Sequence, residues 1–151
     1  MKFQHLVIIG MVAIFSVGCA KEIASNQTEP QTQTTSTTAN TGSESGSFKA
    51  GEHPTKGKVS VITEQGKRYL KFDENFKTDK GPDLFVILHR SDAPPISGIK
   101  EQDYVSVARL EKISGTQRYA LPDNLKLTEF KSVAIWCKKF NATFGYAPIN
   151  G

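Results

Sequence analysis

The sequence predicts an all-β fold: a single β-sandwich or small barrel domain behind a disordered tether. Three observations lead to this expectation. Short runs of alternating or β-branched residues recur between positions 58 and 147. Turn-forming residues separate these runs, and no long helical pattern lies between them. Strands that follow one another roughly every 10–15 residues, without intervening helices, favour a sandwich or a small barrel.

The expected strands follow one another along the C-terminal two thirds of the chain. They are residues 58–63, 68–72, 83–89, 104–110, 117–121, 133–140 and 143–147. Residues 83–89 (DLFVILH) are apolar at both alternating sets of positions, so this strand should be central and covered on both faces. Residues 125–130 are expected to hold one short helical turn. No internal repeat is visible.

The N-terminus has the zones of an export signal. Lys2 supplies a positive charge, and residues 6–15 form an apolar run that stops well short of the roughly 20 residues of a spanning helix. A run of this length is typical of a signal peptide, here residues 1–18. An ordinary cleaved signal with a chance cysteine and a retained transmembrane anchor are the alternatives.

Cys19 directly follows the small residue Gly18, and this stretch resembles a lipobox, although Ser16 stands where such motifs prefer Leu. The resemblance implies that Cys19 is diacylated and attaches the mature chain to a lipid membrane. Two or more acyl chains anchor a protein stably where one chain does not. The expected location is the cell envelope, facing outside the cytoplasm. Because Ala20 and not Asp follows the cysteine, it is the outer membrane if the organism has one.

Residues 19–47 are rich in Thr, Ser, Gln and Asn and have almost no apolar residue after Ile23. Such a segment buries too little apolar surface to offset the entropy of ordering, so it is expected to be a lipid-anchored flexible tether. Residues 48–149 have the composition of one folded domain. Removing residues 1–18 removes one lysine, so the formal charge falls from +4 to +3. No basic stripe is present, and nucleic acid is not an expected partner.

Sequence motifs give little support for enzymatic activity. The predicted domain has no glycine-rich phosphate loop after a strand, no Cys-x-x-Cys, no His-x-x-x-His and no serine in a nucleophile-elbow motif. The domain is therefore not expected to be an enzyme of these classes.

Cys137 is the one thiol left after Cys19 is committed to lipid. Alternation places it on the same strand face as Val133 and Ile135, which should point into the core, with Trp136 on the other face. Three interpretations stay open: a small buried hydrophobe, a redox or ligating thiol, or a disulfide between chains.

The two histidines of the predicted domain are the other candidates for a site. His53 is expected on an exposed loop, and His89 ends the central strand, where it is either partly buried and hydrogen-bonded or lines a pocket. Asp83 is expected to cap a turn by accepting backbone N–H groups. Copper would suit two His and one Cys, but both histidines precede Cys137, and Met1 and Met11 leave with the signal. Haem or another redox group stays open, without support from spacing.

Several motifs of the chain together resemble the DM13 domain family. They are Gly46-Ser47-Phe48, His53 with Gly57, Gly81-Pro82-Asp83-Leu84, Gly115-Thr116-Gln117-Arg118-Tyr119 with Leu121-Pro122, residues 132–137 (SVAIWC) with Phe140, and residues 144–147 (FGYA). The resemblance covers residues 46–149. It implies a β-rich extracytoplasmic electron-transfer module whose hallmark cysteine, here Cys137, acts as a thiol or a prosthetic-group ligand. An envelope redox or surface protein is the implied partner. The alternative is a non-catalytic binding or adhesion module in which Cys137 is structural.

Overall fold

The computed structural model describes residues 44–149. All described residues belong to one compact unit. The predicted signal peptide, Cys19 and most of the predicted tether therefore lie outside the described residues. In the part of the chain that is described, no helix is long and apolar enough to cross a membrane.

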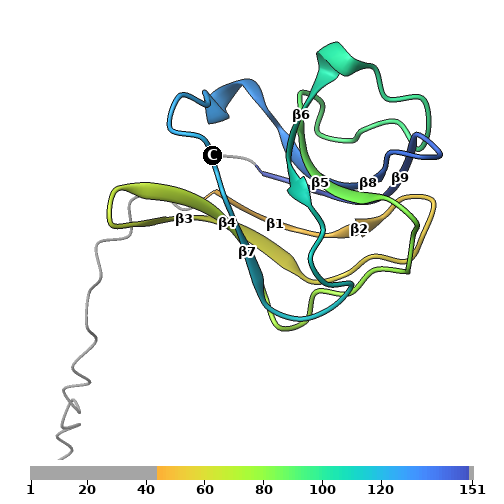
Figure 1. Ribbon diagram of the computed structural model, residues 1–151, viewed down its shortest axis with the longest axis horizontal. Helices are drawn as coiled ribbons and strands as arrows, with labels where there is room; N and C mark the ends of the chain where they lie inside the picture. The colour runs from red at the N-terminus through yellow and green to blue at the C-terminus, as the bar shows by residue number, and fades with distance from the viewer. Residues whose placement is uncertain (1–43, 150–151) are drawn as a thin grey trace, which may run out of the picture. The chain divides into compact units, whose positions relative to one another are not determined.

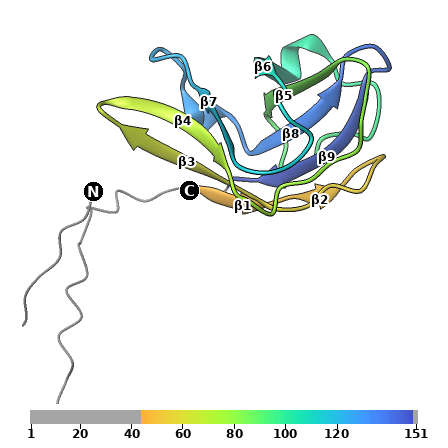
Figure 2. The same ribbon diagram turned by 60° about the horizontal axis from the view of Figure 1, so that its bottom comes forward.

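Two antiparallel sheets form the domain (Figures 1 and 2). The four-stranded sheet has the order β1 (Ser45–Ser47), β3 (Lys58–Glu64), β4 (Lys67–Phe72) and β7 (Gln117–Ala120). The five-stranded sheet has the order β2 (Lys49–Ala50), β9 (Ala142–Pro148), β8 (Ser132–Cys137), β5 (Leu84–His89) and β6 (Tyr104–Arg109). Every strand pair is antiparallel, and the described residues contain no helix beyond two 3₁₀ turns, η1 (Glu101–Asp103) and η2 (Leu127–Glu129). The predicted all-β sandwich is confirmed.

All seven expected strands are present, with changed ends. The strand expected over residues 133–140 stops at Cys137, because a turn over residues 138–141 reverses the chain into β9. The helical turn expected over residues 125–130 is η2. The strands β1 and β2 are too short to give a periodic pattern, and β1 lies in the last three residues of the predicted tether.

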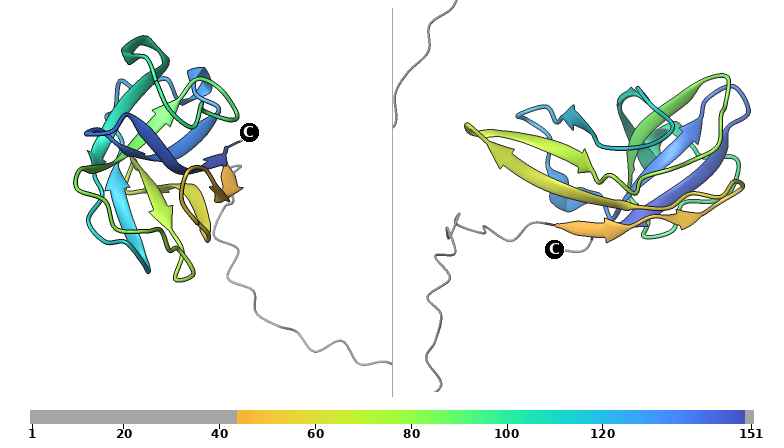
Figure 3. Two further views of the ribbon diagram at one scale, coloured as in Figure 1. Left: turned by 90° about the vertical axis from the view of Figure 1, so that its right-hand side faces the viewer. Right: turned by 90° about the horizontal axis from the view of Figure 1, so that it is seen from below.

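The chain crosses from one sheet to the other at Phe48. Ser45–Ser47 pairs with β3 of the four-stranded sheet, and Lys49–Ala50 pairs with β9 of the five-stranded sheet. Between them Phe48 turns into the core. A side chain at Gly46 would collide with the carbonyl group of Pro148, so this crossing needs a glycine where β1 passes close to the end of β9. The crossing connects the two sheets along one edge (Figure 3).

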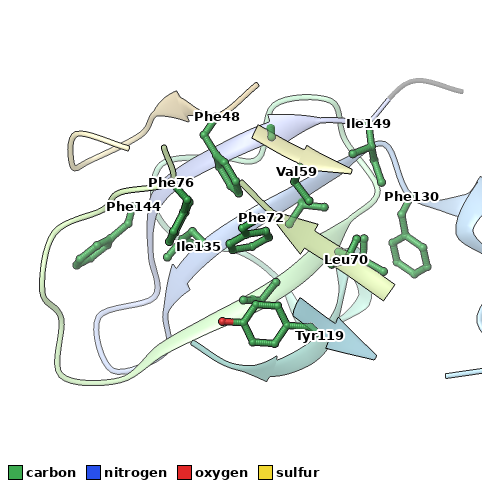
Figure 4. Close-up of a cluster of buried hydrophobic side chains, with 14 of the residues drawn as sticks. Phe48, Val59, Leu70, Phe72, Phe76, Tyr119, Phe130, Ile135, Phe144 and Ile149 are labelled. Atoms are coloured by element: carbon green, nitrogen blue, oxygen red, sulfur yellow. The ribbon is translucent and has the colours of Figure 1, made fainter. Parts of the chain in front are cut away.

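The core lies between the two sheets and is built around aromatic side chains (Figure 4). The ring centroids of Phe48, Phe72 and Phe76 lie 4.6–5.1 Å apart, at tilted or edge-on angles that suit aromatic pairs. Figure 4 places Phe144 beside Phe76 at one end of this core, and Phe130 and Ile149 at the other.

A second, smaller cluster covers the outer face of the five-stranded sheet. It consists of Ile87, Ile99, Ala134 and Trp136, with Phe85, Tyr104 and Tyr146 packed beside them. Ile99 belongs to the loop between β5 and β6, which lies over this face. This loop explains why β5 is apolar on both sides, as the sequence indicated.

Candidate functional site

Cys137 is the last residue of β8 and lies at one end of the core. Its neighbours in register are Leu84, the first residue of β5, and Ala142, the first residue of β9. The residue has no exposed surface and belongs to the core cluster together with Val133 and Ile135. The inward orientation predicted from strand alternation is confirmed. Cys137 is also the free cysteine of the described chain.

The turn before β5 closes this end of the core. Gly81 packs so closely that a Cβ atom there would lie 2.7 Å from Leu84 Cδ2 and 3.0 Å from Phe144 Cζ. Leu84 is the register neighbour of Cys137, and Phe144 follows Ala142 by two residues. Because Leu84 is in register with Cys137, we infer that the backbone at Gly81 and the ring of Phe144 form the cover at the Cys137 end of the sandwich.

His53 adds an outer layer to this cover. Its ring centroid lies 3.9 Å from that of Phe144, with 32° between the ring planes. Its Nδ1 is 3.1 Å from Asp79 Oδ2, with the two side chains 35% and 50% exposed. The loop containing His53 is fixed to β9 through backbone hydrogen bonds from Gly51 and His53 to the carbonyl of Phe144. The histidine predicted on an exposed loop is thus partly exposed, with its ring held in one place.

A hollow of about 440 Å³ lies beside the His53–Asp79 pair. Asp79 lines it together with Lys56 and Lys77, which face each other across an isolated β-bridge. Thr55 also lines it, and its hydroxyl is hydrogen-bonded to the hydroxyl of Thr78 at 2.9 Å.

Asp83 and Trp136 are neighbours of Cys137 in the sheet, but their side chains do not lie on the core-facing side of β8, where the thiol points. The carbonyl of Asp83 accepts a hydrogen bond from the N–H of Lys138 at 2.9 Å. Its carboxylate forms an ion pair with Arg109 at 2.7 Å, instead of the expected turn cap, because β6 brings the guanidinium within reach. Trp136 points to the opposite face of the sheet, as predicted, and its Nε1–H donates to Asn141 Oδ1 at 3.0 Å.

His89 lies away from this group. It ends β5 opposite Ser132 and Tyr104, five positions from Leu84, which corresponds to about 17 Å along the strand. It is 2% exposed, its Nδ1 accepts the N–H of Ser91 at 3.0 Å, and its Nε2 has no hydrogen-bond partner. Burial lowers the pKa of His89, partly offset by Asp103. His89 is thus buried, with one of its two ring nitrogens hydrogen-bonded.

Of the residues singled out from the sequence, Cys137, Asp83, Trp136 and His53 gather at one end of the sandwich, and His89 does not. Sequence reasoning missed the direct roles of Gly81, Phe144 and Asp79 in covering this end. Gly81 and Phe144 stood in the motifs that carried the family resemblance, whereas nothing marked Asp79 as the partner of His53. Among residues 44–149 no group of three or more His, Cys, Asp or Glu side chains is arranged to hold a metal ion.

The fold and the site define a class: a small antiparallel β-sandwich with one thiol sealed at the end of its core. The DM13 family model, described as electron transfer DM13, matches residues 47–149. The chain therefore belongs to the DM13 family. No curated protein matches it, and no solved structure matches it either.

Proposed function

We propose that the protein is a lipid-anchored, extracytoplasmic electron-transfer module that uses Cys137 as a sheltered redox thiol. Its membership of the electron-transfer DM13 family supports the general role. The observation that carries the proposal for Cys137 is its position. The thiol lies at the end of β8, the central strand of its sheet, next to the turn in which Gly81 packs against Leu84 and Phe144.

The chemistry that suits a single thiol is exchange with a disulfide of a partner protein in the envelope. Cys137 loses its proton, its sulfur bonds to one partner sulfur, and the other partner sulfur leaves as a thiolate. One thiol of a second partner, which brings a dithiol, then attacks the Cys137 sulfur and releases the first partner fully reduced. The other thiol of that dithiol displaces Cys137 as its thiolate and closes a disulfide in the second partner, so that two electrons pass from the second partner to the first through Cys137. Since Cys137 has no exposed surface, this exchange requires the cover at Gly81 and Phe144 to open first.

A haem or metal held through Cys137 does not fit the packing of the described residues. The sulfur lies in an apolar core between Leu84 and Ala142. His53 is held by Asp79 and Phe144 at the surface, and His89 lies on another face at the far end of β5. The proposed chemistry therefore proceeds without a resident group on this cysteine.

Thiol labelling of the chain from Ala20 onward tests the proposal, because Cys137 is then its one cysteine. A redox thiol under a local cover should be labelled at a rate that hardly changes with low denaturant, since only a local opening is needed. A Cys137→Ser variant gives the background. If labelling instead follows global unfolding at every denaturant concentration, Cys137 is a packed core residue and the redox proposal is wrong.

The lipid anchor is tested separately by labelling cells with a radioactive or clickable fatty acid. The full chain should incorporate the label and fractionate with membranes, whereas Cys19→Ser should do neither. Cys137→Ser serves as the matched control and should be labelled like the original chain. Equal labelling of the Cys19→Ser chain would contradict acylation at this residue.

A binding module with a structural Cys137 is the second candidate function, and the hollow beside His53 favours it. Lys56 and Lys77 both line this hollow and lie across from each other. Their positive charge suits a small anion best as the ligand. Calorimetry with inorganic phosphate and with short carboxylates checks this. Binding that is lost in Lys56→Ala and Lys77→Ala, but kept in Lys67→Ala, supports the binding function.

A further inference from the structure

Two large apolar side chains stand out because they are exposed. Phe140 is 63% exposed and Ile96 is 58% exposed, and among residues 44–149 no other large hydrophobic residue is classed as exposed. Phe140 lies in the turn between β8 and β9, and Ile96 lies in the loop between β5 and β6. The loop of Ile96 lies along the end of the Phe140 turn and the start of β9, because the carbonyl of Ile96 accepts the N–H of Thr143 at 2.7 Å and Ser97 bridges to Ala142.

The loops that carry these side chains are fixed in place. The hydroxyl of Thr143 donates to the carbonyl of Pro95 at 2.6 Å, and Gly98 N–H donates to the carbonyl of Asn141 at 3.0 Å. The side chain of Asn141 donates to the carbonyl of Ile99 at 3.1 Å and accepts from Trp136 at 3.0 Å. Ile96 and Phe140 are therefore presented by a preorganised support, which lowers the entropic cost of any binding.

Lysines lie in the turn that carries Phe140 and at the end of the loop that carries Ile96. The segments 93–100 and 138–141 contain Lys100, Lys138 and Lys139, and the exposed acids Asp92 and Glu101 border the first of them. The Nζ of Lys139 lies 5.8 Å from the ring centroid of Phe140. Glu52, whose N–H donates to the carbonyl of Thr143, is a further acid on the neighbouring loop, so the positive charge is concentrated in the turn 138–141 that carries Phe140. We call Ile96, Phe140 and these three lysines the apolar tip.

The chemistry of the apolar tip suits an anionic lipid surface better than a protein. Two projecting side chains are too few for a stable protein interface, which buries on the order of 1,200–2,000 Å² in total. A fluid lipid surface needs no such complementary shape: aromatic and aliphatic side chains enter the headgroup region while lysines stay at the phosphates. A second copy of the chain is disfavoured, since it would bring like charges together.

The position of the tip is compatible with a membrane that also holds the chain's own anchor. Chain entry lies at the end of the domain where β9 stops, because Gly46 of β1 packs against Pro148. Phe140 lies at the other end, in the turn before β9 starts. The seven residues of β9 separate the two ends by about 20 Å. Residues 20–43 can extend to at most about 80 Å, which exceeds this separation. Anchoring at Cys19 would thus allow the tip to reach the same membrane, where even weak docking is strengthened by the high effective concentration.

We propose that the apolar tip is a membrane-docking site that inserts Ile96 and Phe140 among anionic phospholipid headgroups. The biological use of this docking rests on the proposed lipid anchor. It lays the domain on the membrane with the Cys137 end toward the lipid, because β8 ends at Cys137 three residues before Phe140.

Co-sedimentation of the unlipidated chain from Ala20 with lipid vesicles tests docking without the anchor. All strand pairs lie within residues 44–149, so this chain retains the whole folded unit. It should bind vesicles of phosphatidylethanolamine containing phosphatidylglycerol, bind phosphatidylcholine vesicles more weakly, and release as salt is raised. Phe140→Ser and Ile96→Ser should each weaken binding roughly tenfold, and Lys138→Glu with Lys139→Glu should weaken it by at least as much.

Matched controls on the other sheet are Ile62→Ser and Lys58→Glu with Lys67→Glu, which should bind like the unchanged chain. Absence of vesicle binding, or equal binding by tip and control variants, overturns the proposal and leaves the tip as a contact for a protein partner. Vesicle binding by this chain does not depend on acylation at Cys19 or on the reactivity of Cys137. The labelling experiments on those two cysteines therefore fail or succeed independently of it.

Discussion

At the scale of single residues, His89 is buried in a way that lowers the free energy of unfolding, because one of its ring nitrogens has no hydrogen-bond partner. Its Nδ1 accepts the Ser91 N–H, so the neutral ring carries its proton on Nε2, which is buried without a partner. Protonation would place a second N–H against Ser91 and add a buried charge. Burial lowers the pKa of His89 from its ordinary value of 6.5. The unfolded chain therefore binds this proton more readily than the folded one, and the free energy of unfolding should fall as pH drops below about 6.5.

Urea unfolding at pH 7, 6 and 5 checks this prediction. His89→Gln should lose stability at pH 7, on the order of 1–2 kcal/mol, but should lose less than the original chain on acidification. Asp103 is the charged residue that offsets the lowered pKa of His89, so Asp103→Asn should steepen the loss. A slope that persists in His89→Gln would assign the acid sensitivity to other groups.

The sequence could predict the orientation of Cys137 but not the state of His89. Cys137 lies on a strand whose period of two places it with Val133 and Ile135, so its burial follows from local alternation. His89 is sealed by the loop between β5 and β6, and a loop without periodicity gives no indication of what it covers. The pairing of Asp83 with Arg109 likewise depends on a strand that follows about 20 residues later, so local turn chemistry predicted a different partner.

At the scale of elements, the turn that contains Gly81 should control access to Cys137. In Gly81→Ala the new methyl group meets Leu84 and Phe144, and overpacking of this kind costs about 1–3 kcal/mol. If the turn opens locally to relieve the contact, labelling of Cys137 in native buffer should accelerate by roughly tenfold for each 1.4 kcal/mol. Thiol labelling in parallel with urea unfolding measures both quantities.

Gly115→Ala provides the matched control for Gly81→Ala. Gly115 has a φ of +84° with open space around it, so alanine there strains the backbone without touching the core. In Gly115→Ala the rate of Cys137 labelling should change only as far as the global free energy of unfolding changes. If Cys137 is labelled faster in both variants, in proportion to the stability that each has lost, then the Gly81 turn does not control access to the thiol and Cys137 is exposed only by global unfolding.

Asn141 is the residue that ties the turn between β8 and β9 to the loop over the outer sheet face. It has a φ of +48°, which asparagine tolerates better than most residues, and its side chain bonds both Trp136 and Ile99. Asn141→Gly keeps the backbone conformation but removes both hydrogen bonds, so it should cost roughly 1–3 kcal/mol. Fluorescence of Trp136, the one tryptophan of the chain, should shift toward the red as water reaches its N–H. An unchanged spectrum would show that the loop stays in place without Asn141.

Prediction of the elements succeeded where the pattern was long and failed where it was short. Strands of four to seven residues with alternating side chains, such as β3 and β8, were expected within a few residues of their ends. The strands β1 and β2 span three and two residues and exist because partners in β3 and β9 are already in place. Tertiary pairing, and not local propensity, thus determines them.

At the scale of the whole molecule, the crossing at Phe48 joins the first strand of one sheet to the first strand of the other. Phe48 sits between β1 and β2 and packs against Phe72 and Phe76 from the centre of the core. The family match begins at residue 47, next to this phenylalanine. The fold class could be predicted from the sequence because it depends on many strands. This crossing could not, since it depends on Gly46 passing close to Pro148 about 100 residues later.

Two deletions test whether this crossing marks the true start of the domain. Removing residues 1–43 deletes no described contact, so the chain from Glu44 should keep its thermal midpoint and its protection of Cys137. Removing residues 1–50 also takes away β1, β2 and Phe48, and exposes the edges of β3 and β9. Loss of the Phe48 side chain alone costs about 3–5 kcal/mol in a packed core, so this chain should be largely unfolded or aggregated.

Phe48→Leu in the chain from Glu44 separates the loss of the Phe48 ring from the loss of β1 and β2, because it keeps both strands and should cost only about 1–2 kcal/mol. Circular dichroism melts compare the three chains. If the chain without residues 1–50 melts cooperatively at the temperature of the full chain, the crossing does not have this role.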